Sequence, residues 1–537
     1  MFQFLSKQQP SSQSRPFLVP TPDPFENPLV EINPAQLRQW AVGLPFANPQ
    51  QLAEAVITSL GRLNRFPGRV KKREELMAIY RTPCNRLQQA SLEQRTSLPA
   101  RLHRQLLQEM AFGYLHLVND CLTNKPSIRS RKQLQSNIYA ALRFLVLEYL
   151  IACEEYDCRA MMTRREIMKL HTLAKEQGLQ NEPVDDMEQS TNQTISKQTK
   201  LTLLLSLLDP CHLQEGEART VFDYLSNLAD AARFDKLESV PEPAGHYVID
   251  RLGEVAPYLF NPKDIETLPP HRFCLFNLIP VSQRLHQDLR TIEKQADGKP
   301  RELQHLSSRA AANLLRRMLK SWHIRLERNS ERHTTSGQVR LWLGLQPIHR
   351  FLTGESASGL SVATDNEEIS LALETGGLGT VRPNTYQPLD CWRFNQSRSG
   401  VALHLPIPQT TTPQVGEIAL IAKPTGNNRD EWKLGIIRRA LRKDEEILEI
   451  GMQFIHGKIV PLSIQPLDLD EDGGPPTLPA LYIDLGGIDR SSLLAPREIL
   501  EPTKAYRVEE MIPAPVISPV QLTEGTAMFE QFRIRRV

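Results

Sequence analysis

The feature that most constrains the fold is a change in hydrophobic pattern near residue 324. Before it, apolar residues recur every three or four positions, as in the series Leu134, Ile138, Leu142, Leu145 and Tyr149, which is one face of an amphipathic helix. After it come short apolar or β-branched runs separated by turn residues, such as "GQVRLWLGL", "EIALIAKP" and "EIGMQF". Such runs are typical of antiparallel strands in a sheet or small barrel. The chain is therefore predicted to be an α+β multidomain protein, with a mainly α-helical N-terminal region followed by a C-terminal antiparallel β-barrel.

Local composition divides the chain further. Residues 1–30 are rich in Pro, Ser and Gln and are predicted to form a disordered arm. Residues 31–324 form the helical region, in which a polar break near 178–198 indicates either two subdomains or a long surface loop. Residues 325–465 are predicted to form the barrel, with a polar insert near 354–388. Residues 466–537 contain an acidic loop and additional C-terminal strands.

Composition and charge narrow the classes of function. The 537 residues carry a formal net charge of only +2, whereas proteins that hold DNA or RNA usually have a strongly basic domain. No apolar run is long enough to span a membrane, so we expect no membrane insertion. The seven cysteines lack metal-ligand spacing, which favours a reducing cytoplasm, no metal and no cofactor. No catalytic motif occurs, and we expect no enzyme.

Two short motifs flank the start of the strand-rich region. Arg328 and Arg332 form R-x-x-x-R directly before the first predicted strand. Farther on, Asn395, Ser397 and Gly400 form N-x-S-x-x-G within a strand that is interrupted by a polar segment. Taken alone, the arginines also fit a solvated basic helix end, and the interruption also fits a plain turn. Together and in this order, they resemble the two-part signature of the PilZ domain family.

The strands that follow resemble the same family. "GVALHLP" comes directly after the second motif, then "GEIALIA" and "WKLGIIRRAL", and the barrel section closes with "EIGMQF". The resemblance covers about 325–465 and leaves the helical region unassigned.

The resemblance implies that the barrel binds cyclic di-GMP, a bacterial signalling dinucleotide. Arg328 and Arg332 would clamp phosphate and guanine, because the guanidinium group is planar, charged and able to pair bidentately. Asn395 and Ser397 would hydrogen-bond a base, and Gly400 would keep the backbone clear of it. The implied protein is a cytoplasmic receptor whose helical region contacts a protein partner of unknown identity. The alternative is an interaction scaffold whose degenerate barrel binds no nucleotide.

Overall fold

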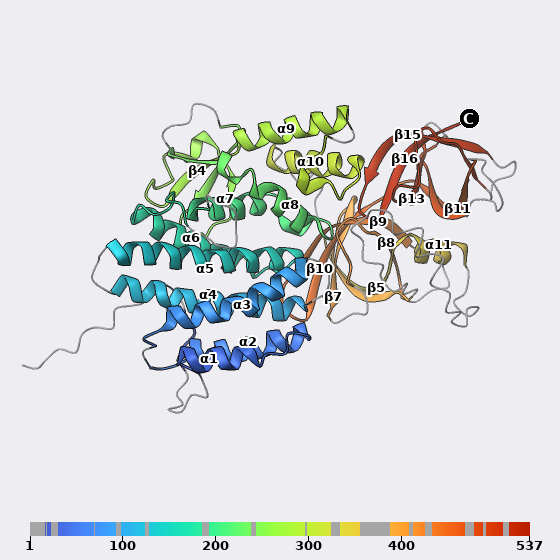
Figure 1. Cartoon of the computed structure of the whole chain (residues 1–537). Coiled ribbons are helices and arrows are strands. Elements are labelled where there is room, and N and C mark those ends of the chain that lie inside the picture. Colours follow the sequence, from blue (N-terminus) through green and yellow to red (C-terminus); the bar gives the residue numbers. More distant parts are fainter. Residues whose placement is uncertain are drawn as a thin grey trace, which may run out of the picture.

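A computed structural model describes most of the chain. The described residues are 17, 19–22, 31–68, 70–92, 98–123, 128–184, 193–237, 243–295, 298–323, 333–354, 387–407, 412–424, 432–467, 477–486, 490–508 and 515–537. Most of the predicted arm and nearly all of the predicted insert lie outside these ranges. Figure 1 shows a helical region on one side and two β-barrels on the other.

The N-terminal region consists mainly of helices that lie side by side (Figure 1). Its α-helices are α1 (Pro34–Val42), α2 (Pro49–Asn64), α3 (Arg73–Leu92), α4 (Ala100–Thr123), α5 (Ile128–Glu154), α6 (Ala160–Glu176), α7 (Ile195–Ser206), α8 (Glu217–Ser226), α9 (Ile279–Lys294) and α10 (Ser308–His323). Local sequence sets the starts of several of them. Before α2, the Asn48 side chain accepts a hydrogen bond from the Gln51 N–H at 3.1 Å, and Pro49 occupies the first turn, a standard N-cap arrangement.

One hydrophobic core joins the helical region. A single cluster of buried apolar side chains extends from Phe17 to Trp322, so the polar break near 178–198 does not divide the region into two cores. Phe17 lies within the predicted arm, yet it is only 4% exposed. Contrary to the sequence prediction, one segment within α5, Ser130–Glu154, is long and apolar enough to cross a membrane, but 89% of its most apolar window is buried inside the protein. This burial is that of a central core helix.

A small antiparallel sheet interrupts the helices and was not predicted from the sequence. Its strands are β1 (Arg233–Asp235), β2 (His246–Asp250), β3 (Tyr258–Leu259) and β4 (Phe273–Asn277), in the order β1-β4-β2-β3. The strands are at most five residues long, too short to show a period against the surrounding helical pattern.

The first barrel is closed and six-stranded. Its strands are β5 (His333–Leu343), β6 (Leu389–Gln396), β7 (Gly400–Pro406), β8 (Ile418–Ala422), β9 (Trp432–Arg442) and β10 (Ile447–Phe454). Alternate residues point inward, and Leu341, Cys391, Leu403 and Ile450 are among its fully buried core. The predicted α+β multidomain fold, helices followed by an antiparallel barrel, is confirmed.

The remaining strands close into a second barrel. They are β11 (Lys458–Pro466), β12 (Leu478–Asp484), β13 (Ser492–Pro496), β14 (Tyr506–Val508), β15 (Val516–Gly525) and β16 (Phe529–Arg536). Its connectivity repeats that of the first barrel: the first strand pairs with the second and fourth, the third pairs with the second and sixth, and the fifth joins the fourth to the sixth. All these pairs are antiparallel. The chain therefore carries two copies of one topology, which its sequence does not reveal as a repeat.

An apolar layer joins the two barrels. The outer faces of β8 and β9 contribute Ile418 and Leu434, and the second barrel contributes Leu481 and Phe529. Helix α11 (Leu345–Thr353), which follows β5, inserts the fully buried Ile348 into the same cluster. In Figure 1, α11 lies beside both barrels, and the C-terminus lies at the upper edge of the second barrel.

Candidate ligand-binding site

The second predicted motif forms a tight hairpin between β6 and β7. The Ser397 N–H donates to the Gly400 carbonyl at 2.8 Å, and the Ser397 hydroxyl lies 3.4 Å from the same oxygen. The Phe454 N–H, at the end of β10, donates to the Ser399 carbonyl at 2.9 Å. The polar interruption "NQSRSG" is therefore a turn that β10 fastens from one side.

Gly400 is needed for a close approach between strands. A Cβ at this position would lie 2.5 Å from the carbonyl oxygen of Met452 in β10. Gly435 of β9 lies still closer to β10 on its other side. Strand β10 is thus held between two glycines, which gives Gly400 a packing role that is independent of any ligand.

Asn395 lies at an irregularity in the sheet. The register shifts between Arg393 and Asn395 on the β7 side of β6, and between Thr334 and Gly337 on the β5 side. Three buried polar atoms here have no hydrogen-bond partner among the described residues: Thr335 Oγ1, Arg393 Nε and Asn395 Oδ1. Because buried polar atoms nearly always have a partner in a protein or water, this double bulge has unused capacity for donating and accepting hydrogen bonds.

The first predicted motif is outside the described residues. Arg328 and Arg332 both fall within 324–332, so the structure places neither of them. The description resumes at His333, the residue after Arg332, and His333 pairs with Gln396 at the end of β6. The chain therefore enters the barrel beside the β6–β7 hairpin. Convergence of all five predicted residues on one site stays a prediction.

Aromatic and charged side chains border the hairpin, and sequence reasoning did not single them out. The rings of Phe394 and His404 stack with centroids 4.0 Å apart, and Lys443 lies over Phe394 at 5.7 Å. Trp392, the register partner of His404, is 48% exposed. The W-x-F spacing in an alternating strand was the available signal, since it places both rings on one face.

Glu449 balances the charge of this face. Lys443 and Arg439 contact its carboxylate at 2.7 and 2.6 Å. Burial alone would raise the pKa of Glu449, but the hydrogen bonds from Lys443 and Arg439 outweigh it and lower that pKa below the ordinary value. These two cations are therefore committed to an internal partner.

The turn between α5 and α6 joins the first barrel to the helices. Tyr156 is 4% exposed, and its ring belongs to the core of the barrel. Its hydroxyl donates to the Leu213 carbonyl at 2.9 Å, and its own carbonyl accepts from the Arg442 N–H of β9 at 2.7 Å. Tyr156 has φ +55°, a left-handed conformation that non-glycine residues adopt only when their surroundings hold them there.

A buried ionic cluster supports this turn. Arg104 of α4 donates from Nε to Glu148 of α5 at 2.8 Å and also contacts Asp157, which Arg159 binds at 2.7 Å. Burial raises the pKa of Asp157, but the hydrogen bonds from Arg159 and Arg104 bring it below the ordinary value. The carboxylate therefore stays charged and fixes the turn to α4 and α5.

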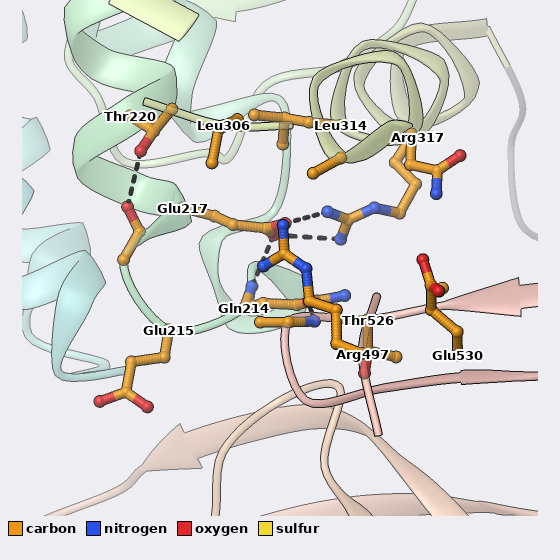
Figure 2. Close-up of a pocket in the computed structure, with 15 residues that line it drawn as sticks. Gln214, Glu215, Glu217, Thr220, Leu306, Leu314, Arg317, Arg497, Thr526 and Glu530 are labelled. Carbon is orange, nitrogen blue, oxygen red and sulfur yellow. Dashed lines mark hydrogen bonds and ion pairs between the residues drawn. The ribbon is translucent and has the colours of Figure 1, made fainter. Parts of the chain in front are cut away.

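A cavity lies where α8, α10 and the second barrel meet. Figure 2 shows Arg317 of α10 paired with Glu217 at the start of α8, and Arg497 of the second barrel lines the same space. The cavity measures about 50 Å³, which suits a few water molecules but not a dinucleotide. Within the part of the chain that the structure describes, no group of three or more His, Cys, Asp or Glu side chains could hold a metal ion.

Comparison with known proteins finds a similarity in the helical region, which the sequence left unassigned. Residues 35–241 match the N-terminal domain of the cyclic-di-GMP receptor FimW. The match runs from α1 past β1 and ends before β2, so it covers less than half of the 537 residues and neither barrel. No curated protein matches the chain. The PilZ resemblance of the barrel therefore stays a prediction.

Proposed function

We propose that the chain is a cytoplasmic bacterial receptor for cyclic di-GMP, with the dinucleotide bound at the β6–β7 hairpin of the first barrel. The observation that carries the proposal is the match of the helical region to the N-terminal domain of the receptor FimW. It is independent of the barrel motif, because the two lie in different parts of the chain. Two separate segments thus point to the same ligand.

In this proposal Arg328 and Arg332 supply the charge for the ligand. A guanidinium group can pair with phosphate or with the O6/N7 edge of guanine and can stack on the base. The next residue, His333, is hydrogen-bonded to the strand that carries Asn395. Asn395 and Ser397 would complete the hydrogen bonds to the base from the hairpin side.

The unpaired polar atoms of the double bulge support a ligand at this place. Arg393 Nε can donate, Asn395 Oδ1 can accept, and the Thr335 hydroxyl can do either. Guanine offers both acceptors and donors along its edges. Binding would give these atoms the partners that they lack.

The signal would reach the helices at two places. The segment with the arginines joins α10 to β5, and Trp322 near the end of α10 is only 1% exposed. An arginine segment that closes on the ligand would therefore pull on a helix packed in the core, and Tyr156 forms the second contact. We propose that the resulting movement changes a surface of the helical region that a partner protein contacts.

Isothermal titration of the full chain with cyclic di-GMP tests the site. The Arg328→Ala/Arg332→Ala and Asn395→Ala variants should lose at least about tenfold in affinity, since each removes hydrogen bonds to a charged or buried group. Arg340→Ala is the matched control, because Arg340 is an exposed arginine elsewhere on β5. Full affinity in the double arginine variant would remove the site from this barrel, and no binding by the wild-type chain would remove the receptor function.

The alternative is a scaffold whose barrel binds no nucleotide. The packing role of Gly400 favours it, because the glycine of the motif has a structural reason to be present. The two functions differ in how partners respond. A receptor should gain or lose a co-purifying protein when cyclic di-GMP is added, whereas a scaffold should keep the same partners.

A further inference from the structure

Arginines gather on one outer face of the second barrel. Arg533 and Arg535 alternate along β16 with side chains of the barrel core, so both point outward. Arg507 lies between two core residues of β14 and also points outward. Strand β15 lies between β14 and β16.

The strand register places these arginines on one surface. Arg535 of β16 pairs with Ser518 of β15, and Arg507 of β14 pairs with Val516 of β15. Val516 and Ser518 are two residues apart, so they lie on the same face of β15. Neighbouring strands lie about 4.8 Å apart and residues two apart along a strand lie about 7 Å apart, so the Arg507 and Arg535 backbones are about 12 Å apart. Among the described residues, Val516 and Ser518 of β15 lie between them on this face. Arg490 also belongs to this group. It lies just before β13 and is followed by Ser491, whose carbonyl accepts a hydrogen bond from the Ile534 N–H of β16.

Among the residues that the structure describes, these four arginines have no acidic partner. All are exposed, and within the described ranges none makes an ion pair or a side-chain hydrogen bond. The arginines between domains behave differently: Arg309 pairs with Glu530 at 2.8 Å and Arg438 with Glu524 at 2.7 Å. Like charges on one sheet face repel each other, so contacts within the described protein do not explain this cluster.

Exposed aliphatic side chains accompany the arginines. Val520 is 48% exposed at a bulge of β15, next to Gln521, which pairs with Arg533. Val537 is 73% exposed, and its N–H donates to the Val516 carbonyl at 3.0 Å. Figure 1 shows this end of the chain at the upper edge of the second barrel, away from the helical region. Within the described ranges, the four arginines and the two valines of this face are therefore exposed.

We propose that this face of the second barrel docks on a membrane surface that contains anionic phospholipid. Guanidinium groups bind lipid phosphate, and each basic residue near an anionic leaflet adds to the attraction. The valines would rest at the boundary between headgroups and acyl chains, as aliphatic side chains of peripheral proteins do. A nucleic acid fits the face less well, because none of the side chains named on it is an aromatic ring on which a base could stack. The docking does not depend on the proposed cyclic di-GMP site, which lies on the other barrel.

Vesicle co-sedimentation of the full chain tests the proposal. The wild type should sediment with phosphatidylcholine vesicles that contain phosphatidylglycerol and stay in solution with phosphatidylcholine alone, and added salt should weaken the binding. Arg533→Glu/Arg535→Glu should weaken it by at least about tenfold. Val520→Asp should weaken it without changing the arginines.

The control makes the same charge change elsewhere on the protein. Arg38→Glu/Arg290→Glu reverses two exposed arginines on α1 and α9 and should bind vesicles like the wild type. Unchanged thermal unfolding would show that each variant is folded. Equal binding to both kinds of vesicle, no binding to either, or full binding by the Arg533→Glu/Arg535→Glu variant would overturn the proposal. Binding to polyglutamate without binding to vesicles would identify an acidic protein as the partner instead.

Discussion

Replacing Gly400 by alanine should loosen the seam between β7 and β10. The new Cβ would lie 2.5 Å from the Met452 carbonyl oxygen, which belongs to the backbone and cannot turn away. One strand must therefore shift, and overpacking of this kind costs about 1–3 kcal/mol. Gly451 provides the matched control on β10, because a Cβ there would meet only Arg439 Cβ, at an ordinary 3.5 Å.

Alanine at Gly400 should lower stability, whereas alanine at Gly451 should not. Gly451→Ala removes a flexible glycine from a strand and should be neutral or stabilising by up to about 1 kcal/mol. Gly400→Ala should then be less stable than Gly451→Ala by about 2 kcal/mol, the middle of the overpacking range. A chain of several domains rarely unfolds in one step. The change in stability should therefore be measured in β7 and β10 themselves.

Hydrogen exchange of peptides from β7 and β10 is the suitable assay. A local loss of about 2 kcal/mol corresponds to roughly thirtyfold faster exchange in Gly400→Ala, while peptides from the helical region should be unchanged. The reasoning fails if Gly400→Ala exchanges as slowly as the wild type, or if Gly451→Ala is equally disruptive.

Three other perturbations test the junction and the helical core. Tyr156→Phe should lower the free energy of unfolding by about 1 kcal/mol, because the hydroxyl hydrogen bond is lost, and Tyr156→Ala should lower it by about 3–5 kcal/mol. In calorimetry of Tyr156→Ala, the first barrel and the helices should melt separately. A single transition, unchanged from the wild type, would contradict this. Glu148→Gln should destabilise the helical region by about 3 kcal/mol in urea denaturation, because it removes a partner from a buried charge, whereas Glu182→Gln, in an exposed pair, should change it by less than about 1 kcal/mol. Burial lowers the pKa of His103 to about 4 and that of His171 to about 3, from an ordinary 6.5; the unfolded chain therefore binds more protons below pH 6.5, and stability should fall as the pH drops from about 6.5 toward 4. Replacing both histidines by glutamine should flatten that dependence, and an equally steep curve would rule out these groups.

The fold class followed from local pattern, but the closure of the barrels did not. Periodicity in the helical region and short alternating runs after it predict which faces are buried. The face that carries Leu134, Ile138 and Leu142 is indeed buried. Closure depends on pairing between distant strands, such as β7 with β10 and β13 with β16, and no local pattern encodes that choice. The second barrel was therefore anticipated only as extra strands.

The candidate site was accessible to sequence reasoning only in part. The hairpin at Ser397 and Gly400 could be predicted because turn residues interrupt an alternating strand. The unpaired atoms near Asn395 could not, since they arise from register shifts against both neighbouring strands. The helical region gave no family from its periodicity, because an amphipathic pattern describes packing rather than ancestry.

The apolar layer between the barrels determines how the chain can be divided. Cutting after Phe454 would expose Ile418, Leu434 and the other β8 and β9 side chains that now contact the second barrel. A fragment ending there would carry a large apolar patch and be prone to aggregate. We therefore expect the two barrels to occur together. A recombinant fragment or a natural relative that has the β6–β7 hairpin should contain both barrels.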